Sequence, residues 1–234
     1  CVFGLFGPKS RDLLKTLSED NFENDQFKFG TAKYINIEGI KIWAQRLSYV
    51  GELGYELYVD FKDAKKIYEL IINKGKDFNL SNCGMHAMDI MRMESGFLHW
   101  GHDISPEENQ FQAGLSFTIS NKKDVDFIGK KSLENIKKEN QKSRFTMFTL
   151  KDSEPGKPLL LHDEPIYIDD KIIGRSTSGN YSFNFKKNLV FGYIKSELSN
   201  DELKSKNLFI EVEKQKYPIV VQSGPLKRTD FKNL

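Results

Sequence analysis

Two glycines spaced three residues apart constrain the fold of the first half of this chain more than any other feature. Gly51 and Gly54 separate an apolar run, residues 40–47, from the alternating segment 55–59. Because side chains alternate between the two faces of a strand, the alternating segment should form a strand with one apolar and one polar face. The expected apolar face holds Tyr55, Leu57 and Val59, and the opposite face holds Glu56, Tyr58 and Asp60.

This glycine-broken strand pair is crowded with aromatic and carboxylate side chains. Such a turn suits a site that stacks a flat ring and accepts hydrogen bonds from it. The alternative is a tight hairpin whose glutamates are simply solvated. The segment alone leaves both interpretations open.

The rest of the first half alternates between helical and strand-like patterns. Leucines at helical spacing after Pro8 predict a short helix, and an apolar stripe that ends at Gly75 predicts a longer one. Asn82 can cap a third helix, on which the mostly inward residues should be Met85, Met88 or else Ile90, Met91 and Met93. The expected helices are 10–17, 63–74 and 84–94, and the expected strands are 32–37, 40–47 and 55–59. This order predicts an α+β sandwich of the ferredoxin-like kind.

The sequence becomes β-rich after about Asn121. A predicted helix from Lys130 to about Glu139 precedes six short apolar segments that are separated by turn signals. Short strands at regular spacing predict a barrel or a sandwich. The expected strands are 145–150, 165–168, 171–177, 189–194, 208–212 and 217–221. We therefore expect two domains, residues 1–120 and 121–234.

Charge and cysteine content exclude several classes of protein. The 35 basic and 33 acidic residues nearly cancel, so no strong field favours nucleic acid. Two cysteines and four histidines form neither a disulfide framework nor a zinc-binding spacing, and we expect no metal site. Without a membrane-length apolar run or a signal peptide pattern, the chain is expected to be soluble and to reside in a reducing compartment.

Three blocks of the sequence resemble the glycine cleavage T-protein, or aminomethyltransferase, family. The first, Tyr49-Val-Gly-Glu-Leu-Gly-Tyr-Glu56, is similar to the family motif Tyr-Thr-Gly-Glu-x-Gly-x-Glu. The second spans 84–96 and continues in Trp100-Gly-His-Asp-Ile104, and the third combines Gln112-Ala-Gly-Leu115 with Asp126-Phe-Ile-Gly-Lys130. The resemblance implies an aminomethyltransferase-like fold, in which the α+β sandwich is followed by a small C-terminal β-barrel.

Within this family, the chain looks most like the folate-binding C-terminal region of dimethylglycine and sarcosine dehydrogenases. Met88 stands where stand-alone T-proteins usually carry an arginine that contacts substrate. The resemblance implies transfer of a one-carbon unit from an N-methyl amine to tetrahydrofolate, which gives 5,10-methylenetetrahydrofolate. The alternatives are a stand-alone aminomethyltransferase or demethylase and a non-catalytic folate-binding regulatory module.

The resemblance also selects the residues expected to bind folate. The pterin ring of folate donates hydrogen bonds from its amino group and ring N–H, and a buried carboxylate matches that edge. By resemblance this acceptor is Glu56, while Tyr49 offers a ring face and a hydroxyl. Arg92 either supports these carboxylates or forms a surface ion pair on a core helix, and Glu52 either binds folate or holds the turn. The predicted folate-binding set is Glu56, Tyr49, Glu52, Tyr55, Arg92 and Trp100.

The same resemblance predicts that this chain is a fragment of a longer enzyme. The segment Gly7-Pro-Lys-Ser-Arg-Asp-Leu-Leu14 is similar to an element in the middle of family members. The catalytic aspartate of the family is therefore expected upstream of Cys1, and an FAD-binding flavin domain of the same polypeptide further upstream still. We expect the fragment alone to be inactive, and the enzyme to reside in the cytoplasm, or in the mitochondrial matrix of a eukaryote.

Overall fold

The computed structural model describes residues 1–119, 126–138, 141–195, 197–227 and 230. Internal contacts divide the described residues into two compact units. The first comprises residues 1–97 together with Lys227 and Asp230, and the second comprises the described residues between 98 and 226. The predicted domain boundary between residues 120 and 121 lies outside the described residues and stays a prediction. Each unit is considered by itself below.

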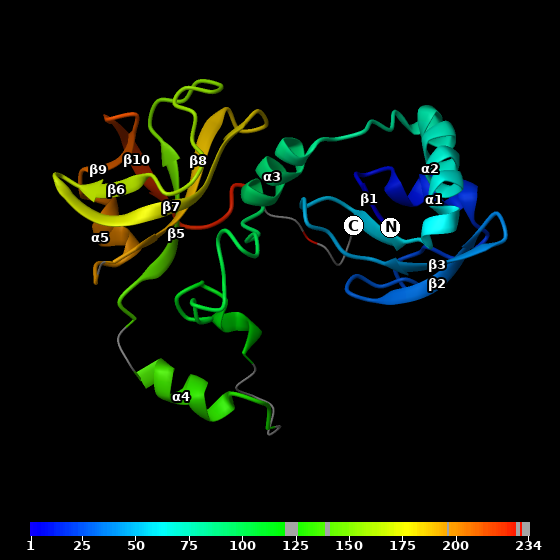
Figure 1. Cartoon of the computed structure of the whole chain (residues 1–234), viewed down its shortest axis with the longest axis horizontal. Helices are drawn as coiled ribbons and strands as arrows, with labels where there is room; N and C mark the ends of the chain where they lie inside the picture. The colour runs from blue at the N-terminus through cyan, green and yellow to red at the C-terminus, as the bar shows by residue number, and fades with distance from the viewer. Residues whose placement is uncertain (120–125, 139–140, 196, 228–229, 231–234) are drawn as a thin grey trace. The chain divides into compact units, whose positions relative to one another are not determined.

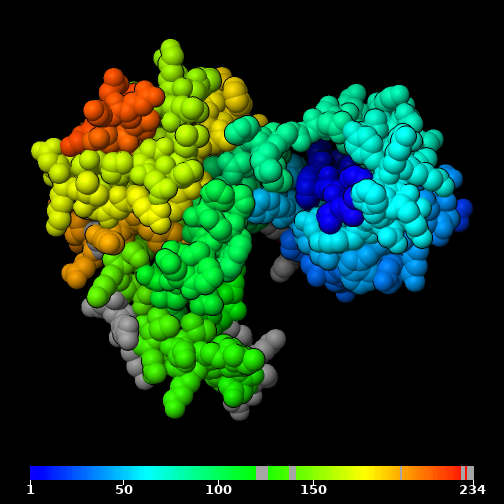
Figure 2. All heavy atoms as spheres, viewed as in Figure 1, coloured from blue at the N-terminus to red at the C-terminus, as the bar shows by residue number. Residues whose placement is uncertain are grey.

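The first unit contains a four-stranded antiparallel sheet in the order β1-β4-β3-β2. Figure 1 labels β1, β2 and β3 of this sheet and the helices α1 and α2. The residues nearest the N-terminus, dark blue in Figure 2, lie at the surface of this unit. The sheet and the helices together confirm the predicted α+β class. The elements are β1 (Val2–Phe6), α1 (Ser10–Leu17), β2 (Ala32–Ile37), β3 (Ile40–Gln45), β4 (Gly54–Tyr58), α2 (Phe61–Gly75), the 3-10 helix η1 (Lys76–Phe78) and α3 (Met85–Glu94).

The core of the first unit lies between one face of the sheet and the helices α1 and α2. The leucines at helical spacing in α1 are buried there together with the inward residues of the strands and of α2. The alternation predicted for β4 is confirmed, because Tyr55, Leu57 and Val59 are buried while Tyr58 and Asp60 are exposed. Each fully buried aliphatic side chain stabilises such a core by about 1.5–3 kcal/mol.

Helix α3 differs from the prediction at its first turn. Gly84 occupies the cap position and no side chain caps the helix, because the Asn82 amide instead donates to the Tyr68 hydroxyl at 2.8 Å. Met85 is 70% exposed rather than inward. It lies five residues before the buried Ile90, and at 3.6 residues per turn this places it about 140° away around the helix.

The second unit is built around a closed antiparallel barrel in the order β10-β5-β8-β7-β6-β9. The barrel alternative predicted from the family resemblance is thus confirmed, and all six predicted strands form it. Its interior is a continuous apolar core. The elements are the 3-10 helix η2 (Ser116–Thr118), α4 (Lys130–Lys138), β5 (Arg144–Leu150), β6 (Pro165–Ile168), β7 (Lys171–Ser182), β8 (Lys187–Ile194), α5 (Asn200–Lys204), β9 (Leu208–Val212) and β10 (Gln215–Gln222). Among the helices described here, none has the length and apolar character needed to cross a membrane.

Candidate functional site

The glycine turn of the first unit docks against the end of α3. Gly51 has a φ of +69°, and a Cβ atom at this position would collide with the Ser95 side chain. Glycine therefore fits on both conformational and steric grounds. Next to it, the rings of Tyr49 and Phe97 lie nearly parallel, with centroids 6.4 Å apart and an interplanar angle of 14°. The turn and the helix end thus form one packed surface.

Glu52 fixes the other side of this turn. Its carboxylate forms an ion pair with Lys227, whose backbone N–H donates to the carbonyl of Glu94 at 2.8 Å. The backbone N–H of Glu52 donates to the Ser48 hydroxyl at 3.1 Å. The Glu52 carboxylate thus contacts Lys227, and both predicted alternatives for Glu52, a contact with folate and a role in holding the turn, stay predictions.

Arg92 is a buried cation on α3. Its guanidinium pairs with the Asp89 carboxylate at 2.6 Å and donates to the carbonyl of Phe97 at 3.1 Å. Since Phe97 also packs on Tyr49, the structure brings Tyr49, Glu52 and Arg92 together around the end of α3. Arg92 does pair with a carboxylate, but its side chain is 1% exposed, so the pair is not the surface ion pair that was predicted. A role of Arg92 toward folate stays a prediction.

Glu56 projects from β4 on the sheet face opposite α1 and α2. It is half-buried, and its carboxylate accepts a hydrogen bond from the Tyr58 hydroxyl at 2.8 Å. This hydrogen bond raises the pKa of Tyr58, since an ionised phenolate could not donate it. In register, Glu56 lies beside Gly4 of β1 and Gln45 of β3. A carboxylate has about four acceptor positions, so one hydroxyl donor leaves capacity for further hydrogen bonds.

The structure places the remaining two predicted residues elsewhere. Tyr55 is fully buried between Phe22 and Phe27, with ring centroids at 6.0 and 5.6 Å, because the alternation of β4 turns it to the face opposite Glu56. Trp100 belongs to the second unit, where its side chain is 65% exposed. The predicted folate contacts of both residues stay predictions.

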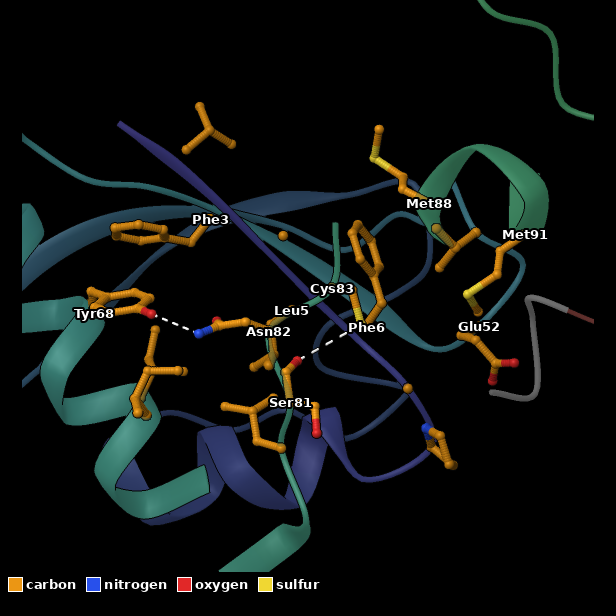
Figure 3. Close-up of a pocket in the computed structure, with 18 residues that line it drawn as sticks. Phe3, Leu5, Phe6, Glu52, Tyr68, Ser81, Asn82, Cys83, Met88 and Met91 are labelled. Atoms are coloured by element: carbon orange, nitrogen blue, oxygen red, sulfur yellow. Dashed lines mark hydrogen bonds between the residues drawn. The ribbon is translucent and has the colours of Figure 1, made fainter. Parts of the chain in front are cut away.

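A cavity of about 550 Å³ runs beside β1 in the first unit (Figure 3). Its lining is largely apolar, with Phe3 and Phe6 from β1, Tyr68 from α2, and Met88 and Met91 from α3. A volume of this size falls within the range of small-molecule pockets. Glu52 adds a carboxylate to the lining, whereas Glu56 is not part of it.

A buried carboxylate in the second unit was absent from the predicted set. Asp103 is 1% exposed and accepts hydrogen bonds from the hydroxyls of Thr177 at 2.5 Å and Ser178 at 2.8 Å. Adjacent strand residues normally point to opposite faces, but the register of β7 shifts between Ser176 and Ser178. This bulge lets both hydroxyls reach the same oxygen atom. The available sequence signal was a run of three hydroxyl residues, 176–178, at the end of the predicted strand 171–177.

Asp103 also closes the turn that carries Trp100. Its second oxygen accepts the backbone N–H of His99 at 2.9 Å, and the carbonyl of His99 accepts the backbone N–H of Asp103 at 2.8 Å. The ring centroids of His99 and His102 lie 4.5 Å apart, and the ring centroid of His162 lies 6.2 Å from that of His102. Within the described residues, no group of three or more His, Cys, Asp or Glu side chains is arranged to hold a metal ion.

Comparison with known proteins identifies relatives along the whole chain. The model of the GCVT N-terminal domain matches residues 1–123, and the model of the glycine cleavage T-protein C-terminal barrel domain matches residues 144–227. Dimethylglycine dehydrogenase of Homo sapiens is 34% identical over 231 residues, which are 98% of this chain and 26% of that protein. An aminomethyltransferase of Symbiobacterium thermophilum is 30% identical, over 82% of this chain and 51% of that protein.

A solved structure is similar in fold. The glycine cleavage system aminomethyltransferase T from Bartonella henselae superimposes with a TM-score of 0.79 at 20% identity, covering 97% of this chain and 59% of that one. This similarity confirms the predicted aminomethyltransferase-like fold. The chain spans about a quarter of the length of the human dehydrogenase that it matches.

Proposed function

Because the chain belongs to the glycine cleavage T-protein family, we propose that it is the tetrahydrofolate-binding region of a dimethylglycine- or sarcosine-dehydrogenase-like enzyme. The enzyme transfers a one-carbon unit from an N-methyl amine to tetrahydrofolate and so produces 5,10-methylenetetrahydrofolate. The identity of 34% to a dimethylglycine dehydrogenase, along 98% of the chain, supports this branch of the family.

The position of Glu56 carries the folate part of the proposal. Its half-buried carboxylate keeps free acceptor capacity beside the Tyr58 hydroxyl. The amino group and ring N–H of a pterin would donate to it in charge-assisted hydrogen bonds, which are about twice as strong as neutral ones. The cluster of Tyr49, Glu52 and Arg92 at the end of α3 supplies further candidate contacts in the same unit.

The greater length of the relatives supports the presence of further domains in the natural polypeptide. The chain covers 26% of the human dehydrogenase, and we propose that the natural polypeptide also contains an FAD-binding domain that oxidises the N-methyl amine. The catalytic aspartate expected from the family would lie between that domain and Cys1. Such an enzyme would reside in the cytoplasm, or in the mitochondrial matrix of a eukaryote.

An activity assay tests whether the reaction depends on sequence outside residues 1–234. We expect the natural polypeptide that contains these residues to form 5,10-methylenetetrahydrofolate from dimethylglycine or sarcosine, and the 234-residue chain alone to form none. Proton transfer requires a group within hydrogen-bond reach of the reacting nitrogen, and the family resemblance predicts that this group, an aspartate, lies upstream of Cys1. Product is measured chromatographically with tetrahydrofolate, the amine and an external electron acceptor supplied. The acceptor is needed because oxidation of the N-methyl group to the methylene level transfers two electrons to the FAD of the proposed upstream domain, and this FAD must be reoxidised in each turnover.

Two outcomes of this assay would contradict the proposal. Sustained turnover by the 234-residue chain would show that the required acid or base lies within residues 1–234. A natural polypeptide that binds tetrahydrofolate but forms no product from any N-methyl amine would favour the regulatory-module alternative.

A further inference from the structure

Gln45 of β3 lies directly beside Glu56 in the sheet of the first unit. The two residues are cross-strand partners in the antiparallel pairing of β3 with β4. Their chain neighbours Ala44 and Leu57 are buried in the core under α1 and α2, so Gln45 and Glu56 share the opposite face of the sheet. The Cβ atoms of such partners are about 4.5–5.5 Å apart. The ends of the two side chains can therefore contact one ligand together.

The amide of Gln45 has unused hydrogen-bonding capacity. Gln45 is half-buried, and within the described part of the chain its side chain makes no hydrogen bond, either to Glu56 or to another residue. The Glu56 carboxylate accepts the Tyr58 hydroxyl through one oxygen. Neither polar end is buried without a partner, so both are open at the surface. A carboxylate, which only accepts hydrogen bonds, thus stands next to an amide that also donates them.

Small residues and aromatic rings surround this pair. The residues in register with the pair across the sheet are Gly4 on β1 and Ala32 on β2. The ring of Phe6 lies over Gly4, because a Cβ atom there would collide with it. On the other side of the pair, Tyr58 and Trp43 are in register with each other. Rings on both sides lower the local dielectric, so the hydrogen bonds of a ligand to the pair are stronger than in water.

The pyrimidinone edge of a pterin presents two donors followed by one acceptor. Its 2-amino group and its N3–H donate, and its carbonyl oxygen O4 accepts. The two oxygens of Glu56 match the two donors, but a carboxylate oxygen facing O4 would repel it. An amide N–H beside the carboxylate completes the match, because it supplies the donor that O4 requires.

We propose that Gln45 is the residue that recognises O4: its Nε2–H donates to this oxygen while Glu56 accepts from the N3–H and the 2-amino group. Gln45 thereby determines specificity for a 4-oxo pterin and holds the ring in register with the carboxylate. The inference rests on the proposed function, since it takes tetrahydrofolate as the ligand. It adds the residue that separates a 4-oxo pterin from a 4-amino pterin.

Titration of the natural polypeptide with two ligands tests the inference: tetrahydrofolate, and 4-amino-4-deoxytetrahydrofolate, in which an amino group replaces O4. Gln45→Met keeps the length of the side chain without its donor, so tetrahydrofolate binding should weaken about three- to tenfold. Gln45→Glu places an acceptor opposite O4 but opposite a donor of the 4-amino compound. The ratio of the two affinities should therefore shift by at least about tenfold toward the 4-amino compound.

The matched control is Gln26→Glu, the same change at an exposed glutamine of the first unit. It should leave both affinities unchanged, because Gln26 lies outside the pair. Circular dichroism of each variant reports whether it has folded.

Two results would overturn the inference. Parental affinity of folded Gln45→Met and Gln45→Glu for tetrahydrofolate would remove Gln45 from the site. An equal loss for both ligands in Gln45→Glu would assign Gln45 a merely structural role, since damage to the sheet does not distinguish O4 from an amino group.

The proposed function is judged separately, on the parent and its Glu56→Gln variant. A parent that binds tetrahydrofolate through Glu56, with both Gln45 variants unaffected, would leave the function standing and remove only the role of Gln45. A folded parent that binds no tetrahydrofolate would contradict both.

Discussion

Replacing Asp103 by alanine is expected to lower the free energy of unfolding of the second unit by about 3–5 kcal/mol. Three donors lose their charged acceptor, and hydrogen bonds to a charged group are worth about 1.5–3 kcal/mol each. The expected loss is smaller than the sum of three such bonds because contributions of groups that share one partner are not additive. These donors are the Thr177 and Ser178 hydroxyls and the His99 backbone N–H. The chain has two tryptophans, Trp43 in the first unit and Trp100 in the second. Urea unfolding followed by Trp100 fluorescence in a Trp43→Phe background measures the loss.

Two further variants show whether the buried carboxylate is responsible. Asp103→Asn keeps an oxygen acceptor without the charge and should lose about half as much, because neutral hydrogen bonds are weaker than charge-assisted ones. Asp152→Ala makes the same deletion at an exposed site of the second unit and should stay within about 0.5 kcal/mol of the parent. A loss below about 1 kcal/mol for Asp103→Ala would mean that its hydrogen bonds do not stabilise the barrel.

Arg92→Ala should have a comparable effect on the first unit, a loss of about 2–4 kcal/mol, because removing one partner of a buried ion pair leaves the other uncompensated. We expect a smaller loss of stability than for a fully buried ion pair, because the Asp89 side chain is 26% exposed. Arg92→Lys should recover part of the loss by pairing with Asp89. Unfolding of this unit is followed by Trp43 fluorescence in a Trp100→Phe background.

The matched control for Arg92 is a surface ion pair on α2. Lys65 lies 3.9 Å from Glu69, with 88% of its side chain exposed, and such pairs contribute about 0–1 kcal/mol. Lys65→Ala should therefore change stability very little. If Arg92→Ala were as mild as Lys65→Ala, the contacts of Arg92 would not hold the end of α3 in place.

Periodicity in the sequence predicted most of the fold because each element presents one face to a core. The leucine spacing of 10–17 matches α1, and segments 165–168 and 208–212 match β6 and β9 at both ends. Errors arose where pairing with another strand, rather than the pattern of the segment itself, decides where an element ends. Strand β7 extends to Ser182 rather than Thr177, because it continues to pair with β8 as far as Lys187.

The candidate site was less predictable than the fold. Alternation correctly separated Tyr55 from Glu56, yet Tyr55 was still included among the folate contacts because it falls within the family motif. Asp103 was overlooked as a buried acceptor because its donors are 74 and 75 residues away. The bulge that aligns their hydroxyls is a consequence of pairing between β7 and β8, which no local pattern encodes.

Titration with tetrahydrofolate of the natural polypeptide and its Glu56→Gln variant tests the central claim most directly. The neutral amide loses the charge-assisted acceptor, so binding should weaken by about 1.5–3 kcal/mol, the value of a hydrogen bond to a charged group. Glu38→Gln, the same change at the exposed turn between β2 and β3, should leave the affinity unchanged. Unaltered affinity of a folded Glu56→Gln variant would remove Glu56 from the folate site and contradict the account.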